Sequence, residues 1–256
     1  MEMLAQTRIV MWEGASLWLI NATPSASRAR QETDLHAHHA IQIVLGLGGA
    51  FRLRTADREA ASLAVAVAAD VGHVFEAEGL FALLFVEPES RAGRAMSARL
   101  FGDGPLAPVP RPAYDGLARA IGRAPGQIPG NDELVRFGRA MVADLAGERL
   151  GDRPDGRVLR MIAAAKDRLE GPVSLSDVVG VGGLSAGRLR HLFVEQTGLP
   201  FQTYLLWLRL MKAIESIVAG ATLTGAAHDA GFADSAHFSR TFRRMFGVAP
   251  ASLRMT

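Results

Sequence analysis

The chain has 256 residues, of which 49% are hydrophobic, and its formal net charge at pH 7 is only +2. This length and apolar content suffice for two domains with cores of their own, while the near-neutral charge points to no particular partner. Because the chain has no cysteine, disulfides, thiolate catalysis and cysteine-based zinc sites are excluded.

The start of the chain shows no secretory signal, because only a short apolar stretch lies between Glu2 and Arg8. The longest apolar run, residues 63–69, is too short to span a bilayer. We therefore expect no membrane partner, and the lack of cysteine agrees with a cytoplasmic location.

Short apolar stretches predict strands in the first third of the chain. Ile41, Ile43, Leu45 and Leu47 fall on alternate positions and would share one face of a sheet. The predicted strands are 16–20, 41–47, 51–53, 63–67 and 81–86. Short strands at this close spacing predict a small barrel or sandwich.

Helical periodicity follows, with predicted helices at 90–101, 112–122 and 132–147. The last helix places Leu134, Phe137, Met141 and Leu145 on one stripe. Such a stripe either covers the barrel or pairs two subunits, so these four residues are candidates for dimerisation.

Periodicity stops at residues 147–156, where glycine, proline and charged residues predominate. This composition is typical of a linker and predicts a boundary between one domain at 1–150 and another at 157–256. From Arg157 onward there are 12 Lys and Arg against 7 Asp and Glu, whereas residues 1–156 carry 16 against 19. The basic second half suits a phosphate-bearing partner.

The second domain contains an internal repeat. In each copy, two apolar residues four positions apart are followed five residues later by a glycine: Leu189, Phe193 and Gly198, then Phe238, Phe242 and Gly247. Each copy predicts a short amphipathic helix, preceded by a short apolar segment and a glycine-containing turn, as in a helix-turn-helix. The apolar stretch 201–219 predicts a long helix that connects the two copies.

The repeat is part of a longer pattern. It includes Gly183-Leu184-Ser185, Leu192-Phe193 and Thr197-Gly198 in the first copy, and Ala230-Gly231-Phe232, His237-Phe238, Ser239-Arg240, Phe242-Arg243-Arg244 and Phe246-Gly247 in the second. This pattern resembles the DNA-binding domain of the AraC/XylS family of transcription regulators. The resemblance implies helix-turn-helix motifs at about 174–198 and 222–247, joined by the helix at about 201–219.

The family resemblance also implies which residues of helices 186–197 and 235–246 contact double-stranded DNA. Positions that read bases are occupied by Gly187, Arg190, His191, Ser235, Ala236 and Arg240. Phosphate contacts are expected near the helix ends, from Arg188, Arg243 and Arg244. His191 and His237 leave an alternative open, because each can instead pack locally.

The first domain contains His36, His38, Gln42 and His73 in a pattern that resembles a cupin barrel. Gln42 stands where a metal-binding cupin has glutamate. Three histidines can ligate a transition metal, but without the glutamate the ligand set is short, so we expect neither a metal nor another cofactor. Side chains expected to point inward are Trp18, Phe51, Phe75 and Phe85, which would line an effector site or form plain core.

The predicted fold is therefore α+β: an N-terminal cupin-like β-barrel with flanking helices, then an all-α domain of two helix-turn-helix motifs joined by a long helix. The predicted function is a sequence-specific transcriptional regulator that responds to an unknown small-molecule effector and acts with RNA polymerase. Activation is the expected mode, and repression stays open. We expect no enzymatic activity; the alternative is a metal-dependent cupin enzyme fused to a DNA-binding module.

Overall fold

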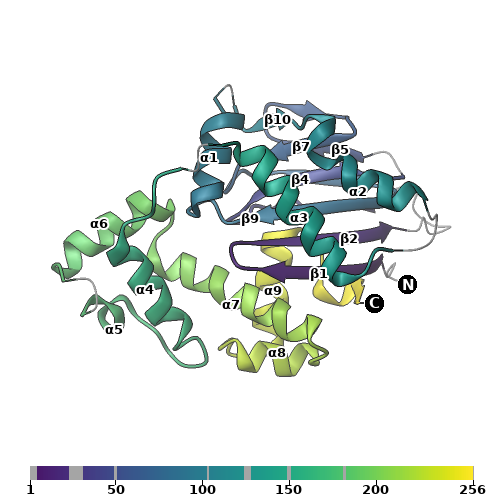
Figure 1. The fold of residues 1–256 in the computed structure, drawn as a ribbon. Coiled ribbons are helices and arrows are strands. Elements are labelled where there is room, and N and C mark those ends of the chain that lie inside the picture. Colours follow the sequence, from purple (N-terminus) through teal and green to yellow (C-terminus); the bar gives the residue numbers. More distant parts are fainter. Residues whose placement is uncertain are drawn as a thin grey trace. The chain divides into compact units, whose positions relative to one another are not determined.

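The computed structural model describes residues 5–22, 31–48, 51–102, 104–123, 128–148, 151–180 and 183–255 (Figure 1). The chain divides into two compact units, one made of Met1–Gly151 with Arg243–Thr256 and the other of Asp152–Phe242. Within the described residues, no helix combines the length and the hydropathy needed to cross a membrane. Two of the predicted linker residues, 149–150, lie outside the described part of the chain.

The first unit is built on a seven-stranded sheet. Its strand order is β10 (Leu106–Pro108), β7 (Ala64–Val67), β4 (Ile41–Gly46), β9 (Gly79–Val86), β2 (Ala15–Ala22), β1 (Ala5–Trp12) and β11 (Leu253–Met255). Neighbouring strands are antiparallel, except that β11 pairs parallel to β1. The C-terminal end of the chain therefore contributes an edge strand to the N-terminal unit.

A second, four-stranded sheet has the order β3 (Gln31–Glu32), β8 (Val74–Ala77), β5 (Phe51–Arg54) and β6 (Glu59–Ala60). Among the described residues neither sheet closes on itself. The expectation of a β-rich first domain with flanking helices is thus confirmed, but the sheets are open and do not form the expected closed barrel.

The larger sheet buries both faces, because its side chains alternate between them. Leu17, Ile43 and Leu84 lie on one face and join a core with three helices. These helices, α1 (Arg91–Leu100), α2 (Arg111–Arg123) and α3 (Asn131–Ala146), cover that face (Figure 1). On the other face, the Phe81 ring packs against Phe75 of the smaller sheet with centroids 5.1 Å apart. The two sheets therefore share a core.

The stripe on α3 packs on the sheet of its own unit. Leu134, Met141 and Leu145 are at most 2% exposed, and they belong to the core beneath the sheet. The Trp12 ring lies so close to Gly138 that a Cβ there would be 2.3 Å from the ring. The stripe thus covers the sheet, which is one of the two roles expected for it, and Phe137 of the stripe is partly buried. Dimerisation through these four residues stays a prediction.

The second unit is helical. It contains α4 (Gly156–Lys166), α5 (Leu175–Val179), α6 (Ala186–Thr197), α7 (Phe201–Val218), α8 (Leu223–Asp229) and the greater part of α9 (Ser235–Phe246). Figure 1 shows α7 running between α6 and α8. The last turn of α9 is grouped with the first unit, as are the 3-10 helix Pro250–Ser252 and β11.

Candidate nucleic-acid interface

Helix α6 is anchored by the apolar residues of the first repeat. Leu189 and Phe193 are fully buried, and the Phe193 ring lies 5.3 Å from the rings of both Phe201 and Tyr204 on α7. Gly198 ends the helix with a left-handed φ of 81°. One face of α6 is thereby held against α7, and the opposite face is left exposed.

The exposed face of α6 carries the residues expected to contact DNA in the first motif. Gly187, Arg188, Arg190 and His191 are all exposed. Ser185 occupies the N-cap position, but its side chain makes no capping hydrogen bond. The amides of the first turn are consequently left without that capping acceptor.

Helix α9 repeats this arrangement. The Phe238 ring packs 5.4 Å from Phe232 and 5.9 Å from Phe242, and all three residues are buried. Asp234 precedes the helix, and its Oδ1 accepts a hydrogen bond from the His237 backbone N–H at 2.6 Å. A carboxylate there satisfies an otherwise unpaired amide and complements the positive end of the helix dipole.

The DNA-contact candidates of the second motif differ in their surroundings. Ala236, Arg240 and Arg244 are exposed, and Ser235 is half-buried. The half-buried His237 ring packs edge-on against Phe232 at 5.3 Å, which favours local packing for this histidine.

Arg243, expected to bind phosphate, instead lies in an ion pair inside the first unit. Its Nε donates to Asp34 Oδ2 at 2.6 Å, and this hydrogen bond lowers the pKa of Asp34. The pair is solvent-exposed, so salt and water screen it. The sequence contained no signal for this contact, because the two residues are 209 positions apart.

The two motifs share a scaffold in the second unit. The guanidinium of Arg209 on α7 donates to the Leu169 carbonyl at 3.3 Å and to the Gly171 carbonyl at 2.7 Å. Gly231, in the turn before α9, has a φ of 77°, and a Cβ there would lie 1.9 Å from the Leu169 carbonyl. The turn of the second motif thus packs directly on the segment that follows α4. Sequence reasoning did not identify the role of Arg209.

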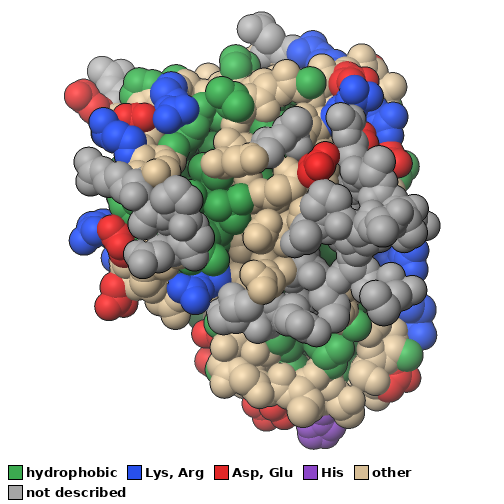
Figure 2. Space-filling model, turned by 90° about the vertical axis from the view of Figure 1, so that its right-hand side faces the viewer, with side chains coloured by type: hydrophobic (Ala, Val, Ile, Leu, Met, Phe, Trp, Pro, Cys, Tyr) green, Lys and Arg blue, Asp and Glu red, His purple; other side chains and the backbone are tan. Residues whose placement is uncertain are grey.

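Charge on the molecular surface is mixed. On the face drawn in Figure 2, Lys and Arg side chains lie beside Asp and Glu side chains among the described residues. This distribution agrees with the formal net charge of +2. Attraction for phosphate must therefore come from local groups such as the exposed arginines of α6 and α9, because the net charge is too small to supply it.

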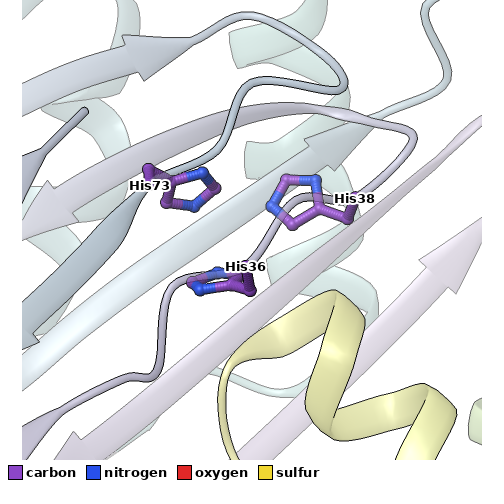
Figure 3. A group of neighbouring side chains, drawn as sticks. All are labelled: His36, His38 and His73. Carbon is purple, nitrogen blue, oxygen red and sulfur yellow. The ribbon is translucent and has the colours of Figure 1, made fainter. Parts of the chain in front are cut away.

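The three histidines of the cupin-like pattern come together in the first unit, where their rings face one another (Figure 3). His36 and His73 lie opposite each other in a backbone bridge, with ring centroids 4.2 Å apart, and His38 lies 5.2 Å from His73. Burial and the neighbouring His73 lower the pKa of His36 to about 4. Burial also lowers the pKa of His38 and of His73, so all three rings are neutral at pH 7.

His39 belongs to a separate site. Its Nδ1 lies 2.8 Å from Asp70 Oδ2, and its Nε2 lies 3.3 Å from Glu89 Oε2. Burial opposes the charged form, but the two carboxylates outweigh it and raise the pKa of His39 to about 9. His39 is thus a cation within a structural ion-pair cluster.

The aromatic residues expected to point inward are buried and in mutual contact. Trp18 lies 5.2 Å from Phe85, and Phe51 lies 5.9 Å from Phe75. Phe246, from the end of α9, packs 5.0 Å from Trp18 within the same unit. These contacts describe an aromatic core between the sheets.

Comparison with known proteins gives one family match, which lies in the C-terminal part of the chain. Residues 180–256 match the family described as helix-turn-helix domain. The HTH-type transcriptional activator RhaS of Escherichia fergusonii is 36% identical over 104 residues, which are 40% of this chain and 37% of that protein. RhaS of Enterobacter sp. is 37% identical over 101 residues, 39% of this chain and 36% of that protein. The match thus spans little more than a third of the length of these curated relatives.

The C-terminal part of the chain is thus similar to the helix-turn-helix domain of known transcriptional activators. The expectation drawn from the repeat is therefore confirmed for the C-terminal part of the chain. At the level of fold, ToxT of Vibrio cholerae O395 is similar over 96% of this chain and 95% of its own, with a TM-score of 0.58 and 12% identity.

Within this helix-turn-helix domain, the exposed arginines were predictable from the sequence and the groups that position them were not. Helical periodicity predicts that Arg190 and Arg240 are exposed. Each lies next to a buried or half-buried residue of its helix, and neighbouring residues of a helix point in different directions. The capping contact of Asp234 and the hydrogen bonds of Arg209 could not be predicted, because the backbone groups that they contact have no sequence signature.

Proposed function

We propose that this protein is a sequence-specific DNA-binding transcriptional regulator that reads two successive major grooves with α6 and α9. The observation that carries the proposal is the paired placement of Arg190 and Arg240. Both side chains are exposed. On the opposite face of α6, Phe193 packs against Phe201, and on the opposite face of α9, Phe238 packs against Phe242. A buried arginine at either position would have excluded base contact.

Base reading in the major groove suits these side chains. Arginine donates two hydrogen bonds to guanine O6 and N7, while the small Gly187 and Ala236 allow the helix backbone to approach closely. His191 and Ser235 complete the proposed base-reading set. Arg188, Arg243 and Arg244 are proposed to bind phosphates and to hold the helices in register.

The N-terminal unit is proposed to be a cupin-like sensor for a small-molecule effector. An effector changes DNA binding only if it binds the DNA-competent and incompetent states with different affinity. The RhaS relatives are named transcriptional activators, so we propose activation through RNA polymerase, in the cytoplasm where target DNA lies.

An enzymatic role is not favoured. A catalytic metal needs an open coordination position that substrate can reach. His36, His38 and His73 are 6%, 3% and 0% exposed, and the rings of Phe85 and Phe246 pack 5.1 and 5.9 Å from His38. We therefore propose that the protein is not an enzyme.

Selection of binding sites from a random DNA duplex library tests the proposed function. The full chain should enrich sequences with two specified segments centred roughly one helical turn apart, about 34 Å. Absence of enrichment over the starting library, or enrichment of one short segment only, would contradict two-groove reading. The double variant Arg190→Ala, Arg240→Ala should lose the enrichment. The matched variant Arg119→Ala, Arg136→Ala removes two exposed arginines of the first unit and should retain it.

A further inference from the structure

We propose that His36, His38 and His73 form a binding site for a divalent first-row transition metal such as zinc. The proposal concerns the first unit alone and does not depend on DNA binding. Sequence reasoning argued against a metal because Gln42 replaces a glutamate. The positions and hydrogen bonds of the three rings now argue for one.

The first argument is distance. One ring nitrogen from each histidine lies within 4.8 Å of the corresponding nitrogens of the other two. Zinc bonded to nitrogens at about 2.0–2.1 Å in a tetrahedron holds them about 3.3 Å apart. Small rotations of the three rings, which already face one another, would close the remaining gap (Figure 3).

The second argument is the state of the ring nitrogens. His36 Nδ1 lies 2.9 Å from the Asp34 carbonyl, and His73 Nδ1 lies 2.9 Å from the Val71 carbonyl. His38 Nε2 lies 2.6 Å from Gln42 Oε1. Carbonyl oxygens only accept hydrogen bonds, so Nδ1 of His36 and Nδ1 of His73 carry the proton. In these two neutral rings the lone pair then remains on Nε2, which is the atom that binds a metal. The His38 ring turns its Nε2 toward the other two rings (Figure 3), so His38 would bind through that atom after losing its contact with Gln42.

This arrangement is the one that metal-binding histidines require. A ligating histidine donates its second ring N–H to a carboxylate, carbonyl or water, which fixes the tautomer and the ring orientation. The His36 and His73 rings meet this condition without a metal. The Gln42 amide, whose Oε1 lies beside His38 Nε2, would have to turn away from that nitrogen when a metal binds.

The third argument is a buried ring nitrogen that has no hydrogen-bond partner. Among the described residues, His73 Nε2 is buried and has no hydrogen-bond partner. Leaving a buried polar atom unpaired costs free energy, and such atoms are uncommon in folded proteins. A metal bound between the rings would satisfy this nitrogen.

The donor set selects the class of metal. Imidazole nitrogen suits zinc, copper, iron and nickel, whereas calcium and magnesium prefer oxygen ligands. Three histidines leave a fourth tetrahedral position for water or another small donor. The apolar rings of Phe85 and Phe246 beside His38 keep bulk water from competing with the ligands.

Metal binding is best measured on the full, tag-free chain after treatment with a chelator. Calorimetric titration with Zn²⁺ should show one equivalent bound with micromolar or tighter affinity. Co²⁺ should give visible absorption bands of a nitrogen-ligated site. Saturating Zn²⁺ should also raise the thermal midpoint, because it binds only the folded chain. A stoichiometry of zero, binding only at millimolar Zn²⁺, or an unchanged midpoint would overturn the proposal.

Three variants locate the site. His73→Gln and His36→Gln should each weaken Zn²⁺ binding by at least tenfold, because each removes a ligand. His228→Gln removes a 91% exposed histidine on α8 and should leave affinity unchanged. Equal loss in all three variants, or no loss in the first two, would place the metal elsewhere. If His73→Gln does not fold, His36→Gln and the wild-type titration still decide.

Discussion

Arg240 and Arg243 lie on the same helix, and both are exposed, but their environments differ. Arg243 donates to the carboxylate of Asp34, whereas α9 presents Arg240 on the proposed base-reading face. The two arginines are therefore expected to have different roles in a DNA complex. One should specify a base, and the other should neutralise a phosphate after giving up its carboxylate partner.

Replacing Arg240 by alanine should relax sequence preference. Loss of a two-bond contact to guanine should cost about 1–3 kcal/mol of binding free energy and remove discrimination at one base pair. Titrations against duplexes that carry each base at each position would measure it. Arg243→Ala provides the contrast. It should weaken binding to all duplexes alike, and it should reduce the slope of log affinity against log salt concentration by roughly one unit. Unchanged affinity and preference in Arg240→Ala would refute the base contact.

For single residues, the sequence predicted which arginines are exposed but not which groups those arginines contact. Helical periodicity separates the exposed Arg190 and Arg240 from the buried Phe193 and Phe242, because burial imposes that period. The partner of Arg243 is set by contact between segments far apart in the chain. No local pattern records such a contact.

Among the structural elements, helices were easier to predict than strands. The long helix expected at 201–219 is α7, Phe201–Val218, because many apolar residues repeat along it. Strand β1, Ala5–Trp12, was not predicted, and neither was β11, Leu253–Met255. A three-residue strand has too few positions to show alternation, and it exists only because β1 pairs with it.

The caps of the two helix-turn-helix motifs lead to a prediction at this scale. Thr222 accepts a hydrogen bond from the Gly225 backbone N–H at 3.1 Å, whereas the Ser185 side chain makes no capping bond. Thr222→Ala should therefore lower the free energy of unfolding by about 1 kcal/mol, and Ser185→Ala by clearly less. Urea unfolding of the full chain, followed by circular dichroism, compares them. Equal losses would show that the two caps act alike.

For the whole molecule, the repeat predicts that its two copies lie in equivalent surroundings, but in the structure their surroundings differ. Gly198 and Gly247 close equivalent helices, and both adopt left-handed φ values, 81° and 70°. Gly198 lies in the second unit, but Gly247 lies in the first, where its carbonyl accepts a hydrogen bond from the Asp34 N–H at 2.9 Å. Composition predicted a domain boundary near residues 147–156. It could not predict that the C-terminal segment belongs to the first unit, because composition carries no information on tertiary contacts.

The two glycines should therefore respond differently to the same substitution. A Cβ at Gly198 would meet no atom within 4 Å among the described residues, whereas at Gly247 it would lie 2.6 Å from the Asp34 carbonyl oxygen and from His36 Nδ1. Gly198→Ala should lose only the left-handed strain, roughly 1–2 kcal/mol of unfolding free energy. Gly247→Ala should lose more, because the backbone of the first unit must also shift.

Urea unfolding midpoints of the two variants measure that difference, and limited proteolysis reports on the C-terminal segment. Gly247→Ala should expose sites after residue 243 to cleavage, because the contacts with Asp34 hold this segment on the first unit. Gly198→Ala should leave the same sites protected, since those contacts are remote from the first repeat in sequence. Equal midpoints and equal cleavage would mean that the two copies end in equivalent surroundings, contrary to the asymmetry of the fold.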